Sequence, residues 1–165
     1  MNNFDMNSTD SSGLTPFEAS LPMMLYRVLD AIMPAYRALF AEYGLTEQQW
    51  RVLRTLWDGE SLSSTELAAR TLIPAASLVG VLDRLERKGL IARIRSVADR
   101  RVMIAKLSAE GRSLEQQISP RLETIQASVR ACVSPAEWQK LTEILKEFEA
   151  GPRSVASQEE DRHRA

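Results

Sequence analysis

Residues 74–107 read PAASLVGVLDRLERKGLIARIRSVADRRVMIAKL, and this stretch decides the fold. Its first half repeats apolar residues every three or four positions, which predicts a helix over residues 74–88. Pro74 suits the first turn of that helix, and Gly89 suits its end. After Gly89 the segments LIARIR and RVMIAKL are rich in apolar and β-branched residues, which predicts two strands. We therefore expect a helix followed by a β-hairpin.

The segments before this stretch predict two shorter helices. Thr46 and Gln49 have the spacing of a capping box at the start of TEQQWRVLRTLWD, and Ser63 and Glu66 have it at the start of SSTELAAR. The order helix, short helix, helix, hairpin is typical of a winged helix-turn-helix, which we assign to residues 46–107.

Long helices are predicted on both sides of this winged region. The first follows Ser20 and ends before Gly44, a second begins at Ser108, and a last one begins at Ser134. The expected fold is mainly α with a two-stranded β wing, built as a winged helix-turn-helix plus a helical dimerisation region. We assign the dimerisation region to residues 17–45 and 108–150, and expect disordered ends at 1–16 and 151–165.

The net charge hides a strong local imbalance. The 165 residues carry a formal net charge of -1, which argues against a generally basic protein. Between Arg84 and Lys106, however, eight basic residues stand against Glu86 and Asp99, and 8 − 2 gives a local charge of +6. We infer that this region faces an anionic partner.

Several classes of protein are disfavoured by residues that are scarce. Cys132 is the single cysteine and His163 the single histidine, so we expect no disulfide, no metal site and no cofactor. The sequence has no GxSxG motif and no phosphate-binding glycine loop, so we do not expect an enzyme. With no signal segment and no apolar run near the roughly 18 residues that cross a bilayer, we expect a cytoplasmic protein without a membrane partner.

The helix at 74–88 is predicted to have two different faces. An apolar stripe is suited to a core, and a stripe with a hydroxyl, a glycine and two arginines is suited to the major groove of DNA. The first stripe holds Leu78, Leu82 and Leu85, and the second holds Ser77, Gly80, Arg84 and Arg87. An ordinary amphipathic helix with a solvated face is the alternative interpretation.

The tip of the hairpin favours the DNA-binding interpretation. Arg95, Arg100 and Arg101 gather where burial cannot explain them, and arginine suits a narrow minor groove. Asp99 would repel phosphate as a bare carboxylate. We expect it to accept hydrogen bonds from an adjacent arginine or loop amide and so to fix the shape of the loop.

The motifs LTEQQWRVL, ELAAR, Pro74-x-x-Ser77, LERKGLIAR and ADRR, in this order and spacing, resemble the MarR family of bacterial transcription regulators over about residues 21–149. Within the family, LTEQQWR and SLVGVLDRLERKGL most resemble the regulators of homoprotocatechuate degradation. The resemblance implies a winged-helix homodimer that binds pseudo-palindromic double-stranded DNA, usually as a repressor, and is released by a small phenolic or aromatic-acid ligand. It also implies DNA contacts from the recognition helix, at Pro74, Ala75, Ala76, Ser77 and Arg84, and from the wing, at Asp99 and Arg101.

One departure from the family pattern bears on specificity. Many members carry more polar residues where this chain has Ala75 and Ala76. An alanine methyl can contact a thymine methyl, but it offers no hydrogen bond to a base. We therefore expect fewer direct base hydrogen bonds and more reliance on Ser77, Arg84 and the wing.

The remaining assignments concern the dimer and the ligand. Apolar residues of the first and last helices are the candidate dimer interface: Leu21, Leu25, Leu29, Leu141, Ile144, Leu145 and Phe148. The candidate ligand-lining residues are apolar or guanidinium side chains suited to an aromatic acid: Met23, Met24, Arg27, Met33, Trp50, Arg51 and Arg54. Alternatives are a winged helix that binds only protein, and a redox-responsive regulator acting through Cys132.

Overall fold

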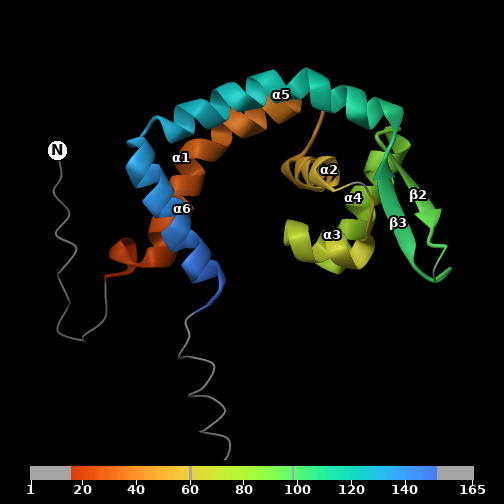
Figure 1. Ribbon diagram of the computed structural model, residues 1–165, viewed down its shortest axis with the longest axis horizontal. Coiled ribbons are helices and arrows are strands. Elements are labelled where there is room, and N and C mark those ends of the chain that lie inside the picture. Colours follow the sequence, from red (N-terminus) through yellow and green to blue (C-terminus); the bar gives the residue numbers. More distant parts are fainter. Residues whose placement is uncertain (1–15, 60, 98, 152–165) are drawn as a thin grey trace, which may run out of the picture. The chain divides into compact units, whose positions relative to one another are not determined.

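The computed structural model describes residues 16–59, 61–97 and 99–151. Apart from Pro16 and Gly151, the predicted disordered ends lie outside the described residues. Figure 1 shows a mainly helical chain with a small antiparallel sheet, which confirms the predicted fold class. The helices are the 3-10 helix Phe17–Ala19, α1 Leu21–Glu42, α2 Glu47–Asp58, α3 Ser64–Thr71, α4 Ala75–Arg87, α5 Ala109–Arg130 and α6 Pro135–Glu149, and the strands are β1 Ser61–Ser63, β2 Ile91–Arg95 and β3 Met103–Leu107.

The sheet has a third strand that the sequence analysis did not predict. β2 and β3 form the expected hairpin, and β1 pairs with the other edge of β3, in the order β1-β3-β2. Leu62, the buried residue of β1, lies opposite Ala105. Three residues are too few to show an alternating pattern, so this strand exists only through its pairing with β3.

Side-chain caps and glycines set the helix boundaries. The predicted capping box of Thr46 and Gln49 is present at α2, and that of Ser63 and Glu66 is present at α3. A third, between Ser134 and Glu137, begins α6. Hydrogen bonds from Ser63 lower the pKa of Glu66, as expected for a carboxylate that caps a helix. Gly89 after α4 has a φ of 71°, a conformation that glycine adopts without steric cost.

The core of the winged region lies between α2, α3, α4 and the sheet. Leucines from all three helices are fully buried there, and an aromatic cluster continues the core toward α1. Phe40 of α1 stacks on Trp50 of α2 with ring centroids 4.6 Å apart, and Trp50 meets Trp57 edge-on at 5.1 Å. Trp57 also donates its indole N–H to the Gly111 carbonyl of α5 at 3.1 Å. These contacts hold the C-terminal end of α1 and the N-terminal end of α5 against the winged region.

The chain divides into two compact units at Glu123 and Thr124. In the first unit, α1 and the first half of α5 are joined by an ion pair between Glu42 and Arg121 and by a hydrogen bond from the Tyr43 hydroxyl to the Gln117 carbonyl. The second unit contains the end of α5 and α6.

In the described ranges no single helix is long and apolar enough to cross a membrane. α3 and α4 taken together have the length and composition of a membrane span, but the two helices are bent by 107° relative to each other.

Candidate nucleic-acid interface

The recognition helix α4 has the two faces predicted from its sequence. Its inner face is buried against α2 and α3, where Figure 1 shows it beside the hairpin. The outer stripe is open: Ser77, Arg84 and Arg87 are exposed, and Gly80 is half-buried. Leu78, Val81, Leu82 and Leu85 form the buried face.

Arg84 and Gly80 form one feature of that outer stripe. A Cβ placed on Gly80 would find the Arg84 guanidinium as its nearest neighbour outside its own helix backbone, at 3.4 Å from Nη1. The arginine therefore lies back along the helix over the glycine. Within the described residues Arg84 has no ion pair, so its charge is open to solvent or to a phosphate.

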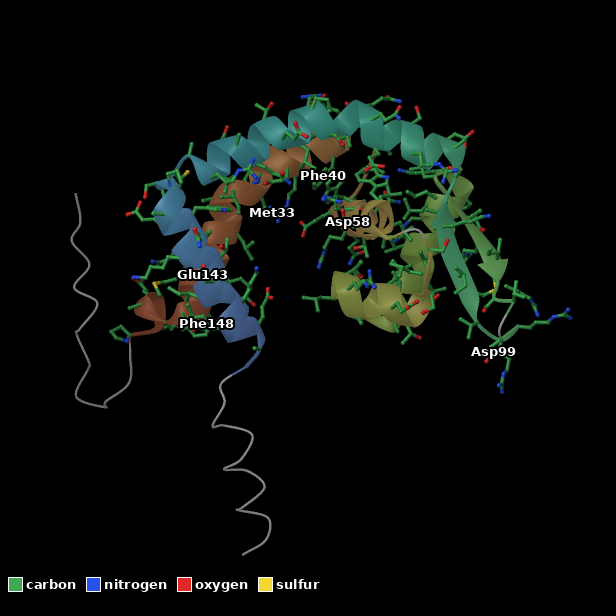
Figure 2. All side chains as sticks on the ribbon, in the orientation of Figure 1. Met33, Phe40, Asp58, Asp99, Glu143 and Phe148 are labelled. Carbon is green, nitrogen blue, oxygen red and sulfur yellow. The ribbon has the colours of Figure 1, made fainter. Side chains whose placement is uncertain are left out.

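The tip of the wing presents further arginines. Arg95 and Arg100 are exposed, and the Arg101 side chain is 93% exposed, so burial does not account for their presence. Figure 2 shows Asp99 at the end of the hairpin, where it joins this group. Arginines at a protruding tip have the reach and charge needed to enter a groove of DNA.

Asp99 makes the kind of contacts expected from the sequence. Its carboxylate accepts a hydrogen bond from the Arg101 backbone amide at 2.9 Å and one from the Arg101 Nε at 3.2 Å. Its carbonyl accepts a hydrogen bond from the Val102 amide at 2.9 Å, and the Val102 carbonyl accepts one from the Ser96 amide at 2.9 Å. These bonds hold the turn and restrain the Arg101 side chain at the same time.

Less of the positive charge between Arg84 and Lys106 is free than the sequence indicates. Arg93 is held by Asp83 and Glu86, and Lys88 donates to the Gly44 carbonyl and, at 3.4 Å, to the Gln49 side chain. Asp83 lies one residue before Arg84, just outside that segment. Apart from Lys88, the basic side chains of this segment that remain exposed are those of the outer stripe, those of the wing tip and Lys106 of β3.

The start of α4 is apolar where many recognition helices are polar. Pro74, Ala75 and Ala76 are exposed, as their assigned role requires, and Pro74 caps the helix. Val79, one turn further, is 55% exposed and was missed because the sequence alone gave no reason to remove a valine from the core. A hollow between α3 and α4 is lined by Ser64, Thr65, Ala68, Ala75, Leu78 and Val79. This end of α4 offers methyl groups to any bound surface.

The candidate ligand residues of α2 already have structural partners. Trp50 is buried in the aromatic cluster, and Arg54 pairs with Asp58. Arg51 donates from Nη1 to the Thr71 carbonyl at 2.8 Å, at the end of α3, while its buried Nε has no hydrogen-bond partner. Arg51 therefore carries a buried donor with no hydrogen-bond partner among the described residues.

The candidate ligand residues of α1 are spread along that helix. Met24 lies sixteen residues before Phe40, about 24 Å along the axis, whereas Met33 lies only seven residues, about 10 Å, before it. Figure 2 shows Met33 on the same helix as Phe40. Met23 and Arg27 belong to the distant part, where Arg27 is 3.7 Å from Glu18. A single chain therefore does not bring Met23, Met24 and Arg27 to Trp50, Arg51 and Arg54.

The candidate dimer residues are exposed apolar side chains, except Leu145, which is half-buried. On α1 these are Leu21, Leu25 and Leu29, and on α6 they are Leu141, Ile144 and Phe148. Val28 and Tyr26 of α1 are also exposed and enlarge the apolar surface of that helix.

The metal-ligating residue types form no metal-binding cluster in the part of the chain that the structure describes. There, no group of three or more histidine, cysteine, aspartate or glutamate side chains is arranged to hold a metal ion. Cys132 is exposed, with its thiol 3.5 Å from the Ser128 carbonyl.

Known proteins are similar to this chain in sequence and in structure. The sequence pattern of the MarR family matches residues 45–103, which cover most of the winged region. The homoprotocatechuate degradative operon repressor of Escherichia coli is 34% identical over 129 residues, which are 78% of this chain and 87% of that protein. This relative also confirms the predicted similarity to regulators of homoprotocatechuate degradation.

Two solved structures are also similar. Bordetella bronchiseptica BpsR, described as regulated in its DNA binding by 6-hydroxynicotinic acid, has a TM-score of 0.75 and 26% identity and covers 83% of this chain and 98% of its own. NadR in complex with 4-hydroxyphenylacetate has a TM-score of 0.71 and 27% identity, with coverages of 79% and 96%. With the winged fold, the exposed basic wing and a relative of this identity and coverage in place, the chain belongs to the MarR family.

Proposed function

We propose that this protein is a DNA-binding transcription repressor that acts in the cytoplasm as a homodimer and is released from its operator by a small phenolic or aromatic acid. The observation that carries the proposal is the set of unburied arginines on two adjacent elements. Arg84 lies on the outer stripe of α4, and Arg100 and Arg101 lie at the tip of the wing. The Escherichia coli relative named above is an operon repressor, which supports this proposal.

The two elements suit two different grooves of DNA. A helix such as α4 fits the major groove, and an arginine-bearing hairpin fits the adjacent minor groove. Phosphate contacts from these arginines would supply most of the affinity and make it depend on salt. Ser77 offers a hydroxyl to a base edge or a phosphate, while Ala75 and Ala76 offer only methyl groups.

Dimerisation accounts for the apolar surfaces of α1 and α6. Exposed leucines, an isoleucine and a phenylalanine on these helices have no reason to face water, and a second copy of the chain would bury them. A two-fold dimer also presents two recognition helices. These can reach successive major grooves when they are about 34 Å apart. Deletion of α6 from Ser134 onward is expected to yield monomer or aggregate with little operator affinity.

The ligand site is proposed near Arg51 and Met33. The buried Arg51 Nε lacks a hydrogen-bond partner, and a carboxylate is a natural acceptor for a guanidinium. Arg51 also holds the end of α3, directly before the turn that leads to α4. An acid that draws Arg51 away from the Thr71 carbonyl would therefore disturb the recognition helix. Met23, Met24 and Arg27 can join such a site only from a partner chain, because they lie too far along α1.

The testing experiment measures binding of the full-length protein to duplex DNA from upstream of its own gene, at several salt concentrations. Each measurement is repeated with a panel of phenolic and aromatic carboxylic acids. We expect tight, salt-dependent binding that one or more acids weaken at least tenfold, which corresponds to about 1.4 kcal/mol of coupling. Binding that is absent or independent of salt would refute the DNA-binding role. Acids that bind the free protein and leave its DNA affinity unchanged would refute the proposed release.

A further inference from the structure

Arg93 joins the wing to the recognition helix. It lies in the middle of β2, and its Nη2 is 2.7 Å from Asp83 Oδ1 and 2.6 Å from Glu86 Oε2, both on α4. Its Nε donates to the same Glu86 oxygen at 2.9 Å. The Arg93 backbone amide donates to the other Glu86 oxygen at 3.1 Å. One residue of β2 thus makes four polar contacts with two residues of α4.

Among the ion pairs that the structure describes in the first unit, Arg93 is the least exposed arginine, while Glu86 and Asp83 are 38% and 47% exposed. The Arg93 side chain is 26% exposed, whereas the paired side chains of Arg121 and Glu42 are each 52% exposed. The hydrogen bond from Arg93 lowers the pKa of Glu86, and the bond to Glu86 raises the pKa of Arg93, so both groups stay charged near neutral pH. Partial burial and multiple bonds make such a pair more rigid than an exposed one.

The partners of Arg93 stand next to the residues assigned to DNA. Asp83 precedes Arg84 directly, so the cluster begins beside the arginine of the outer stripe. Arg93 lies opposite Ala105 of β3 and two residues before Arg95, where β2 leads into the wing tip. The cluster therefore connects the element assigned to the major groove with the element assigned to the minor groove.

We propose that Arg93 is a positioning residue that sets the wing at a fixed place relative to α4, so that Arg84 and Arg101 can contact the same DNA together. Arg93 itself is bonded to two carboxylates and does not contact DNA. This inference rests on the proposed DNA-binding function. It has a physical basis in DNA geometry, because the spacing between a major groove and its neighbouring minor groove leaves little freedom for two linked elements.

Two simpler roles make different predictions. If Arg93 only stabilises the fold, its loss lowers affinity by the same factor whether or not Arg101 is present. If Arg93 only neutralises Asp83 and Glu86 near the phosphates, removal of those two carboxylates restores affinity to a variant that lacks Arg93. A positioning role predicts a loss of the Arg101 contribution and no such restoration.

The experiment is a double-mutant cycle of Arg93→Met and Arg101→Ala in the full-length protein, with the upstream DNA as probe. In the wild-type background we expect Arg101→Ala to weaken binding about tenfold, a typical loss for a charge-assisted contact. In the Arg93→Met background the same change should weaken binding less than about threefold. Equal fold-changes in the two backgrounds would overturn the proposal.

Further variants separate the remaining outcomes. Asp83→Asn with Glu86→Gln, added to Arg93→Met, should leave the affinity low, and recovery to near wild-type affinity would mean that neutralisation is the role. Arg121→Met breaks an arginine–glutamate pair away from the wing and should leave the full Arg101 effect in place. If Arg93→Met does not fold, Glu86→Gln carries the same cycle, because it removes the charge of the principal partner and keeps its size.

Two results of the DNA titration separate the positioning role of Arg93 from the DNA-binding function. Wild-type protein that does not bind the DNA would contradict the proposed function itself. Wild-type protein that binds tightly, with additive effects of Arg93 and Arg101, would contradict only the positioning role.

Discussion

Gly80 is expected to lower the stability of the protein and to strengthen its binding to DNA. It lies inside α4, where a glycine destabilises a helix by roughly 0.5–1 kcal/mol relative to alanine. Its φ is not in the left-handed region, and a Cβ at this position would meet only the flexible Arg84 guanidinium at 3.4 Å, an ordinary contact distance. The fold therefore has no need for glycine at this position.

Gly80→Ala should accordingly raise the free energy of unfolding by about 0.5–1 kcal/mol, which is about 1–4 °C in melting temperature for a chain of this size. The same change should weaken operator binding. The added methyl group stands on the outer stripe beside Ser77 and Arg84 and would hold the helix about 1 Å further from the DNA. Such a shift breaks one or two hydrogen bonds of about 1 kcal/mol each, which is about 5-fold to 30-fold in affinity.

The assay combines thermal unfolding, in the absence of DNA, with titration of labelled upstream DNA. Gly111→Ala is the matched control, because a Cβ there would lie 2.2 Å from the Leu90 carbonyl oxygen and 3.1 Å from Leu107 Cδ2. That variant should lose stability where Gly80→Ala gains it. A Gly80→Ala protein that binds DNA as tightly as wild type would refute close approach of the α4 backbone, and a less stable one would refute the packing argument.

Four other perturbations have expected outcomes. Arg101→Ala should flatten the dependence of log affinity on log salt by about one unit if it removes a phosphate contact, with an unchanged melting temperature; an unchanged slope and affinity would take Arg101 out of the interface. Asp99→Ala should weaken DNA binding, although it removes a negative charge, because the hydrogen bonds that hold the wing turn are lost; tighter binding would contradict that role. Each operator thymine can be replaced in turn by deoxyuridine, which lacks the methyl group, and binding should weaken by about 0.8 kcal/mol at any base whose methyl contacts Val79. Val79→Ala should reduce the loss of affinity caused by that replacement. If every thymine can be replaced without loss of affinity, methyl recognition is excluded. The lowered pKa of Glu66 means that its cap stabilises the fold above about pH 4.5 and that this contribution disappears as pH falls through the lowered value. The free energies of unfolding in urea of Glu66→Gln and wild type should therefore differ at pH 7 and approach each other as the pH is lowered through that value; a constant difference would show that the charge is irrelevant.

Features that depend on neighbours in the sequence were predicted well. The capping boxes at Thr46 and Ser63 need only residues three positions apart, and the switch in periodicity after Gly89 marks the start of the hairpin. Local rules suffice for these because the interacting groups are close along the chain. The two faces of α4 followed from the same kind of local repeat.

Features that depend on distant partners were not predictable. The third strand exists because Leu62 meets Ala105, forty-three positions away. Val79 looks like a core residue in the sequence, and only the packing of α4 against α3 leaves it exposed. The grouping of the candidate ligand residues also depends on distant partners, because the 1.5 Å rise per residue of α1 separates Met24 from Trp50 within one chain, and a partner chain would have to bring Met24 to the proposed site.

The distribution of charge shows how pairing changes a functional argument. From Arg84 to Lys106 the sequence carries +6, but Arg93 is bonded to Glu86 and to Asp83, which lies one residue outside that segment. Including Asp83 lowers the sum to +5, and the cluster of one arginine with two acids leaves a net −1 next to Arg84. A binding surface defined by total charge would therefore include Arg93 and the neighbouring part of β2, at the base of the wing. A surface defined by unpaired charge loses Arg93 and consists mainly of the outer stripe of α4 and the wing tip, with Lys106 of β3 as a further exposed base. Two separate contact areas bind one DNA duplex effectively only when the distance between them is held, and that requirement gives the partly buried Arg93 cluster its expected role.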